Sequence, residues 1–100
     1  GAMRDVDDKF FDRADAHIHL SNDQVKGVSS GRASASMMYV TARFNAWLAA
    51  YSCENSESMR ELRAKNIEDF VGEYRKMLEE NLDDYIANFD DYIAKGRDGA

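Results

Sequence analysis

The chain contains no proline, and its six glycines lie near the two ends or at the internal positions Gly27, Gly31 and Gly72. Proline interrupts a helix because it lacks a backbone N–H, and glycine weakens one because it loses the most conformational freedom on ordering. Long helices are therefore permitted over nearly the whole sequence. An apolar fraction of 44% supplies material for a core, although 100 residues allow only a small one.

Two segments in the first half have apolar or small side chains at the three- and four-residue spacing of a helix. The first extends over about residues 7–26, and the second over about residues 32–53. Residues 27–31 form a connector of the length that joins antiparallel neighbours in bundles. Gly27 stands where a left-handed C-cap is expected.

The segment over residues 32–53 differs from the first because apolar or small side chains cover most of its circumference. Large ones form one stripe and small ones form another, and a helix with that pattern is usually buried on nearly all sides. We therefore expect it to be the central helix. We also expect removal of the Trp47 side chain to be among the most destabilising single changes. The large stripe comprises Met37, Val40, Phe44, Trp47, Leu48 and Tyr51, and the small one Ala35, Tyr39, Ala42, Ala46 and Ala49.

A third helical segment begins near residue 57, where Ser58 and Glu61 have the spacing of a capping box. A looser cap at Asn66 predicts a break there, and continuity across Asn66 and Gly72 stays open. The stripe ends at Lys95–Gly96. The predicted fold is all-α: a single domain over residues 4–96, built as a small bundle of three helices, or four with that break, with a long C-terminal helix. Residues 1–3 look like an expression-tag remnant joined to a native start.

The C-terminal helix carries an apolar strip that extends beyond the reach of the other two helices. Residues 66–95 as one helix measure about 45 Å, against about 30 Å for each shorter helix. We expect another chain to cover the strip, with a homodimer as the simplest case, and the acidic residues beside it favour an antiparallel pair. The alternative is a bend near Asn66 or Gly72 that returns the strip to the first helix. The candidate interaction surface comprises Leu82, Tyr85, Ile86, Phe89, Tyr92 and Ile93.

Charge and composition exclude several classes of partner. The net charge is −6, and six carboxylates with no basic residue lie between Lys76 and Lys95, so we expect no binding to nucleic acid. No apolar run reaches the roughly 18 to 20 residues that span a bilayer, so we expect no membrane partner. The single cysteine, Cys53, and the lack of a signal-peptide pattern indicate a cytoplasmic protein.

The string Asp15-Ala16-His17-Ile18-His19 has the pattern of metal-dependent amidohydrolases. That chemistry needs a strand, on which alternate side chains share a side, and a barrel of about 250 residues. On a helix His17 and His19 point about 200° apart and cannot bind one ion together. No Glu-x-x-His pair, serine elbow, phosphate loop or calcium loop is present, so we expect no enzymatic activity and no cofactor.

Polar residues within apolar or small-residue stretches leave one alternative open. Asn22, Arg43 and Asn45 are such residues, and the simplest expectation is that Arg43 pairs with a carboxylate such as Asp15. Asp15 and His19 lie on one helical face at a four-residue step. Together with Arg43 they form the alternative ligand site, for a small molecule or a metal ion.

Four stretches of the sequence together resemble a known family. The resemblance covers about residues 8–94 and concerns a family of short, mostly proteobacterial proteins that is catalogued only as a domain of unknown function. Such a resemblance implies no activity, cofactor or catalytic residue. The stretches are 10–16 (FFDRADA), 20–24 (LSNDQ), 42–46 (ARFNA) and 74–85 (YRKMLEENLDDY).

The sequence therefore predicts a small cytoplasmic helical protein that acts through protein–protein contact, as an interaction or regulatory module, with another protein or with itself. The alternative is a small-ligand or metal-binding protein that uses Asp15, His19 and Arg43.

Overall fold

The structure, a computed structural model, describes residues 7–94. It consists of α1 (Phe10–Gln24), α2 (Ser30–Tyr51), α3 (Ser56–Glu61), α4 (Arg63–Ala87) and the short π-helix η2 (Asp90–Ala94). No strand occurs within these residues. The prediction of an all-α fold with a long C-terminal helix is confirmed. The predicted tag remnant at residues 1–3 and the helix end at Lys95–Gly96 lie outside the described residues.

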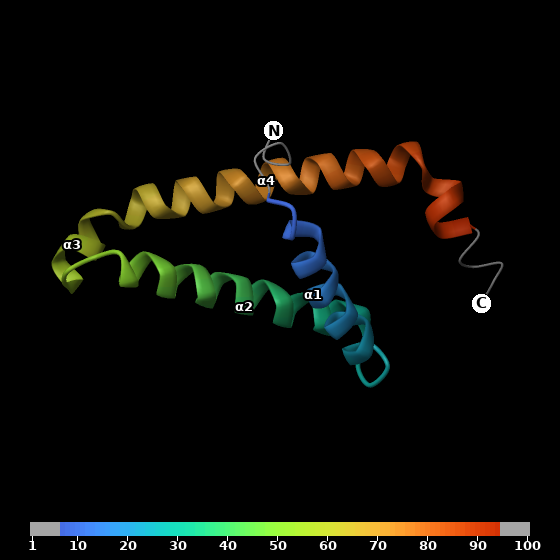
Figure 1. Cartoon of the computed structure of the whole chain (residues 1–100), viewed down its shortest axis with the longest axis horizontal. Helices are drawn as coiled ribbons and strands as arrows, with labels where there is room; N and C mark the ends of the chain where they lie inside the picture. Colours follow the sequence, from blue (N-terminus) through green and yellow to red (C-terminus); the bar gives the residue numbers. More distant parts are fainter. Residues whose placement is uncertain (1–6, 95–100) are drawn as a thin grey trace.

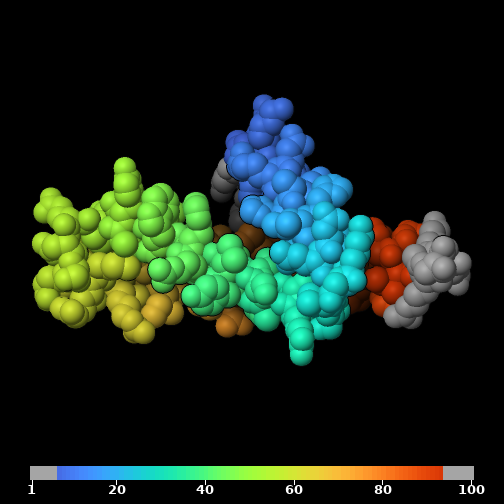
Figure 2. Space-filling view, turned by 90° about the horizontal axis from the view of Figure 1, so that it is seen from below, coloured from blue at the N-terminus to red at the C-terminus, as the bar shows by residue number. Residues whose placement is uncertain are grey.

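The helices form an open bundle. α2 and α4 are two long arms that α3 joins at one end (Figure 1). α1 packs on α2, and Figure 2 shows it projecting to one side of the layer that α2 and α4 form. Successive helices contact each other, whereas α2 and α4 have little direct backbone contact. The radius of gyration is 16.8 Å, against about 13 Å for a compact domain of 100 residues, so the chain encloses little of its own surface.

α1 is fixed at its start by an ion pair rather than by an N-cap side chain. The Arg13 guanidinium donates hydrogen bonds to both carboxylate oxygens of Asp7, at 3.1 and 2.8 Å, and the Lys9 N–H donates to the same carboxylate at 3.0 Å. These bonds, those from Arg13 first, lower the pKa of Asp7 to about 2. The group is exposed, so the pair contributes little to stability.

The connection between α1 and α2, residues 25–29, has the predicted length of five residues but lies two residues earlier than predicted. α2 begins at Ser30, because the Ser29 hydroxyl oxygen accepts a hydrogen bond from the Arg32 N–H at 3.3 Å and so acts as its N-cap. The predicted left-handed C-cap at Gly27 is wrong, since no described glycine has a positive φ. α1 ends in right-handed geometry at Val25, and the Gly27 N–H donates to the Gln24 carbonyl at 3.0 Å.

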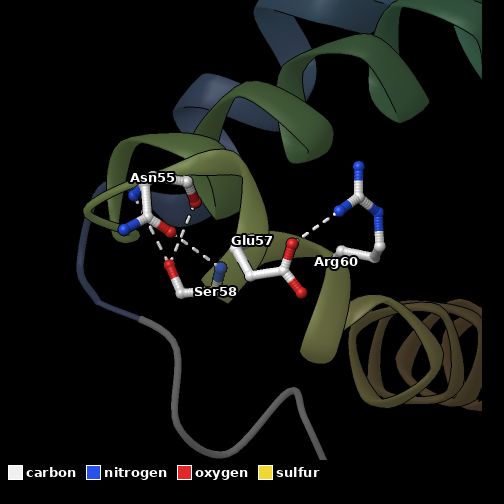
Figure 3. Close-up of polar contacts among 4 residues, drawn as sticks. All are labelled: Asn55, Glu57, Ser58 and Arg60. Atoms are coloured by element: carbon white, nitrogen blue, oxygen red, sulfur yellow. Dashed lines mark hydrogen bonds and ion pairs between the residues drawn. The ribbon is translucent and has the colours of Figure 1, made fainter.

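α3 begins at Ser56, as predicted to within one residue, but its N-cap lies three residues before the predicted one. Asn55 is the N-cap: its Oδ1 accepts from the Ser58 N–H at 2.9 Å, and its own N–H donates to the Ser58 hydroxyl oxygen at 3.4 Å (Figure 3). The predicted box of Ser58 and Glu61 is therefore wrong. Ser58 is the third residue of a box that Asn55 opens, because an asparagine amide satisfies orphan amides as well as a serine hydroxyl does.

The break that separates α3 from α4 lies at Leu62 and not at Asn66. The Leu62 N–H is shared between the Ser58 and Met59 carbonyls, at 3.3 and 3.2 Å, and its φ of −93° and ψ of 0° remain right-handed but depart from regular α-helix values. α4 then runs without interruption across Asn66 and Gly72. The two arms are therefore joined by a short turn of helix, with no second break in the longer arm.

α4 ends sooner than predicted. The Asn88 side chain donates to the Asp84 backbone carbonyl and to its Oδ1, both at 3.0 Å, and the chain bends there into η2. The Tyr92 ring returns to 4.8 Å from the Tyr85 ring, and the Tyr92 hydroxyl donates to Asp84 Oδ2 at 3.1 Å. The bend converts the predicted straight strip into one with a folded end.

Burial is confined to two small side chains among the described residues, Ala33 at 4% and Ala49 at 9% exposure. The prediction that the second helix is buried on nearly all sides is wrong: Trp47 is 54% exposed and Tyr51 78%. α2 contacts α1 and α3, and the side chains of its large stripe stay between 38% and 78% exposed. An apolar pattern indicates which side chains favour burial, but not whether the same chain supplies the cover.

Candidate functional site

An apolar groove lies where the two arms approach α3. It encloses about 530 Å³, and its walls come from α2, α3 and α4. Alanines recur at three- and four-residue steps on the α2 wall, so its side chains are small. They do not fill the space in front of the apolar α4 side chains. The lining residues are Ala42, Asn45, Ala46, Ala49, Ser56, Met59, Arg60, Arg63, Asn66, Ile67, Phe70 and Val71. We call this the α2–α4 groove.

The polar groups of the groove stand at its rim. Arg60 pairs with Glu57 at 2.7 Å on the surface of α3 (Figure 3). Arg63 lines the groove one turn further along and takes part in no ion pair among residues 7–94. Asn45 and Asn66 are half-buried. The groove therefore has an apolar floor, and among the described residues Arg63 is the positive charge on its edge that no ion pair offsets.

The apolar strip of α4 continues from the groove toward the C-terminus. A second, shallower hollow of about 320 Å³ lies along it, lined by Val71, Tyr74, Leu78 and Leu82 together with Arg75 and Glu79. Every lining residue belongs to α4, so the hollow is a furrow between side chains of one helix rather than a pocket between helices. Such a furrow is what a neighbouring helix fills with its own side chains.

The predicted interaction surface is largely open. Leu82, Tyr85 and Ile86 lie on α4, and Ile86 is 74% exposed. Phe89 lies at the bend, Tyr92 is exposed on η2, and Ile93 is half-buried there. No finding tests what these six residues contact in solution, and their role as an interaction surface stays a prediction.

A second apolar surface lies on the side of α2 that faces away from the groove. The Phe44 and Trp47 rings are 5.5 Å apart and the Trp47 and Tyr51 rings 5.3 Å apart, so the three form a ladder along one face. All three are exposed. The ladder stiffens the outer face of α2 through contacts within the helix alone.

The alternative ligand site receives no support from the arrangement. Asp15 and His19 are exposed on α1, and Arg43 is exposed on α2. None of them lines either hollow, and no ion pair joins Arg43 to Asp15. Within residues 7–94 no three potential ligands from histidine, cysteine, aspartate and glutamate gather around one point. Of the three polar residues singled out in the sequence, only Asn45 lines the groove, while Asn22 and Arg43 lie exposed.

Sequence reasoning missed the groove although the signal for one wall was present. The alanines of α2 indicate close approach by another helix, and they do face α4. The other wall was hidden because Met59 and Ile67 stand on either side of the helix break at Leu62, whose position the capping residues did not reveal.

None of the helices in the described part of the chain combines the length and apolar character needed to cross a bilayer. The predicted absence of a membrane partner and the predicted cytoplasmic location both stay predictions.

Comparisons with known proteins agree with the predicted resemblance. The NMR structure of the protein NB7890A from Shewanella sp. is 36% identical in sequence, with a TM-score of 0.76 over 90% of this chain and 96% of that one. No curated protein matches the chain. The family described as "protein of unknown function (DUF3144)" matches residues 10–86. The chain therefore belongs to the DUF3144 family.

Proposed function

We propose that this protein is an interaction module, which acts by burying its open α4 strip and α2–α4 groove against another polypeptide. The single observation that carries the proposal is the near absence of a core: among the described residues, only Ala33 and Ala49 are buried. Large apolar side chains are open in the α2–α4 groove, on the α4 strip and on the outer face of α2. A helical chain of this kind gains most of its stability from whatever covers such surfaces.

The exposed area shows how much surface the chain leaves uncovered. The chain exposes 8723 Å², whereas a compact monomer of 11.4 kDa exposes about 5,800 Å². The excess, roughly 2,900 Å² per chain, is total rather than apolar area; its apolar part includes the exposed side chains of Leu78, Leu82, Tyr85 and Ile86, which follow one another along one face of α4. A polypeptide partner is the kind of ligand that covers so large an area, because a small molecule covers only a fraction of it.

A photo-crosslinking side chain at two positions of α4 tests the proposal in cells of the source organism. Tyr85 lies on the strip, and Glu80 lies on the opposite, polar face of the same helix. We expect covalent protein adducts from position 85 and at least tenfold fewer from position 80. Equal yields from the two positions, or none from either and none from Ala46 in the groove, would overturn the proposed function.

A further inference from the structure

The α2–α4 groove and the C-terminal part of the α4 strip, from Leu78 onward, are two open apolar surfaces of the same chain. Rigid helices cannot bring them together within one molecule, since the groove opens beside residues 63–71 and the strip continues beyond it along the same straight helix. Two molecules can, because an antiparallel pair of α4 helices sets the second half of each against the first half of the other.

The area agrees with a second copy as the occupant. Burying even half of the excess of roughly 2,900 Å² on each copy gives an interface of about 2,900 Å², within the size range of obligate homodimers, while the outer face of α2 stays exposed. A small peptide segment would leave most of the excess uncovered. The furrow between Val71 and Leu82 then meets the same furrow of the partner across the two-fold axis.

The charges are complementary in the same arrangement. Arg60 and Arg63 stand at the edge of the groove, and Arg63 has no ion-pair partner among the described residues. The segment that would enter is acidic, with Glu79, Asp83 and Asp84 on α4 beside the strip. A parallel pair would set these carboxylates against their own counterparts, whereas the antiparallel pair brings them to the basic edge.

From these observations we infer that the chain forms a reciprocal antiparallel homodimer, in which the strip of each copy, from Leu78 onward, lies in the α2–α4 groove of the other. The inference rests on the proposed function and names its partner as a second copy. Each groove is incomplete without the other chain, and the two contacts are identical by symmetry.

Two variants of the full chain separate this arrangement from a simple strip-to-strip pair. Ala46→Glu places a charge in the groove, and Ile86→Asp places one on the strip; both positions are exposed within one chain. Each variant alone is expected to weaken dimerisation by about 100-fold or more, because every contact then buries an unpaired carboxylate. The matched controls are Ser36→Glu on another face of α2 and Ala87→Asp on the polar face of α4, and both should leave dimerisation within about threefold.

Mixing the two variants is the decisive step. A heterodimer of Ala46→Glu with Ile86→Asp retains one unaltered groove-to-strip contact, so sedimentation velocity should show a dimer in the mixture that neither variant forms alone. If a single variant loses helix as a monomer, far-UV circular dichroism should show that helix returning on mixing. Reversing the groove charge with Arg63→Glu should weaken the parent dimer and reduce its sensitivity to salt.

Three outcomes would overturn the inference. A dimer that Ala46→Glu leaves intact and Ile86→Asp breaks is a strip-to-strip pair. A mixture that stays monomeric excludes the reciprocal contact. A monomeric parent that gives adducts to a different protein from position 85 leaves the proposed function standing but refutes the second copy, whereas a monomeric parent without adducts refutes both.

Discussion

The two ends of the α2–α4 pair have similar apolar side chains and opposite degrees of closure. At the α3 end, Ala49 is buried, Met59 is half-buried, and the capping box of Asn55 fixes the turn. At the other end, Leu82 and Ile86 continue the α4 stripe with the same spacing but are 53% and 74% exposed. Periodicity is therefore equal at both ends, and what differs is whether the chain returns to cover it.

The comparison shows which forces hold each end. The hydrogen bonds of the Asn55 capping box and the burial of Ala49 close the α3 end, and both involve residues that are close in sequence. The far end depends on contacts that this chain does not make with itself. We therefore expect the α3 end to respond to single substitutions in an isolated chain, and the far end to respond through association.

The largest effect is expected at Ala49, where α2 is buried beside α3. Ala49→Asp buries an unpaired carboxylate and should lower the free energy of unfolding by about 3 kcal/mol. Urea denaturation measures it, with Ala50→Asp as the matched control, because the neighbouring residue is exposed at the same helix end. Equal losses for the two variants would show that the α3 end is as open as the other.

Trp47 should matter less than its size suggests. The side chain is half exposed and its described contacts are with the Phe44 and Tyr51 rings, so Trp47→Ala should cost about 1 to 2 kcal/mol in urea denaturation. Tyr39→Ala, at an exposed position without a ring partner among the described residues, should cost less than about 0.5 kcal/mol. A loss of about 3 to 5 kcal/mol for Trp47→Ala would mean that the outer face of α2 is covered in solution.

The Asn55 cap tests how the turn is held. Asn55→Ala removes the acceptor of the Ser58 N–H and should cost about 1 kcal/mol. Glu54→Ala, one residue earlier and exposed, should be close to neutral. No difference between the two variants in thermal unfolding would show that the box does not set the position of α3.

The smallest effect concerns the folded end of the strip. The hydrogen bond to Asp84, together with its negative charge, raises the pKa of Tyr92 above the ordinary value of 10.0. The folded state thus favours the neutral phenol, so this contribution to stability is complete below about pH 10 and is lost as the pH rises through the folded pKa. Asp84→Asn should lower the Tyr92 pKa in an NMR titration, and Asp83→Asn should change it less. An unchanged value in Asp84→Asn would mean that η2 does not fold back.

The helices and the strip were predictable from the sequence because both follow from the spacing of side chains along one helix. The N-cap of α3 was not, since Asn55 and Ser58 are both competent caps and only the observed hydrogen bonds select Asn55. The break at Leu62 was not either, because no capping side chain marks it, whereas Asn66 is a competent cap that the chain does not use. The bend at Asn88 depends on Tyr92 reaching Asp84, which a repeat pattern does not reveal. The exposure of the large α2 side chains was not predictable, because a sequence shows which faces favour burial but not which chain buries them.

Sedimentation equilibrium of the parent chain at tens of micromolar tests the central claim most directly, since it measures whether this open chain exists alone. We expect a single species of twice 11.4 kDa, with the dimer persisting to low micromolar concentrations because the buried area is large. A strict monomer of 11.4 kDa over the whole concentration range would contradict it.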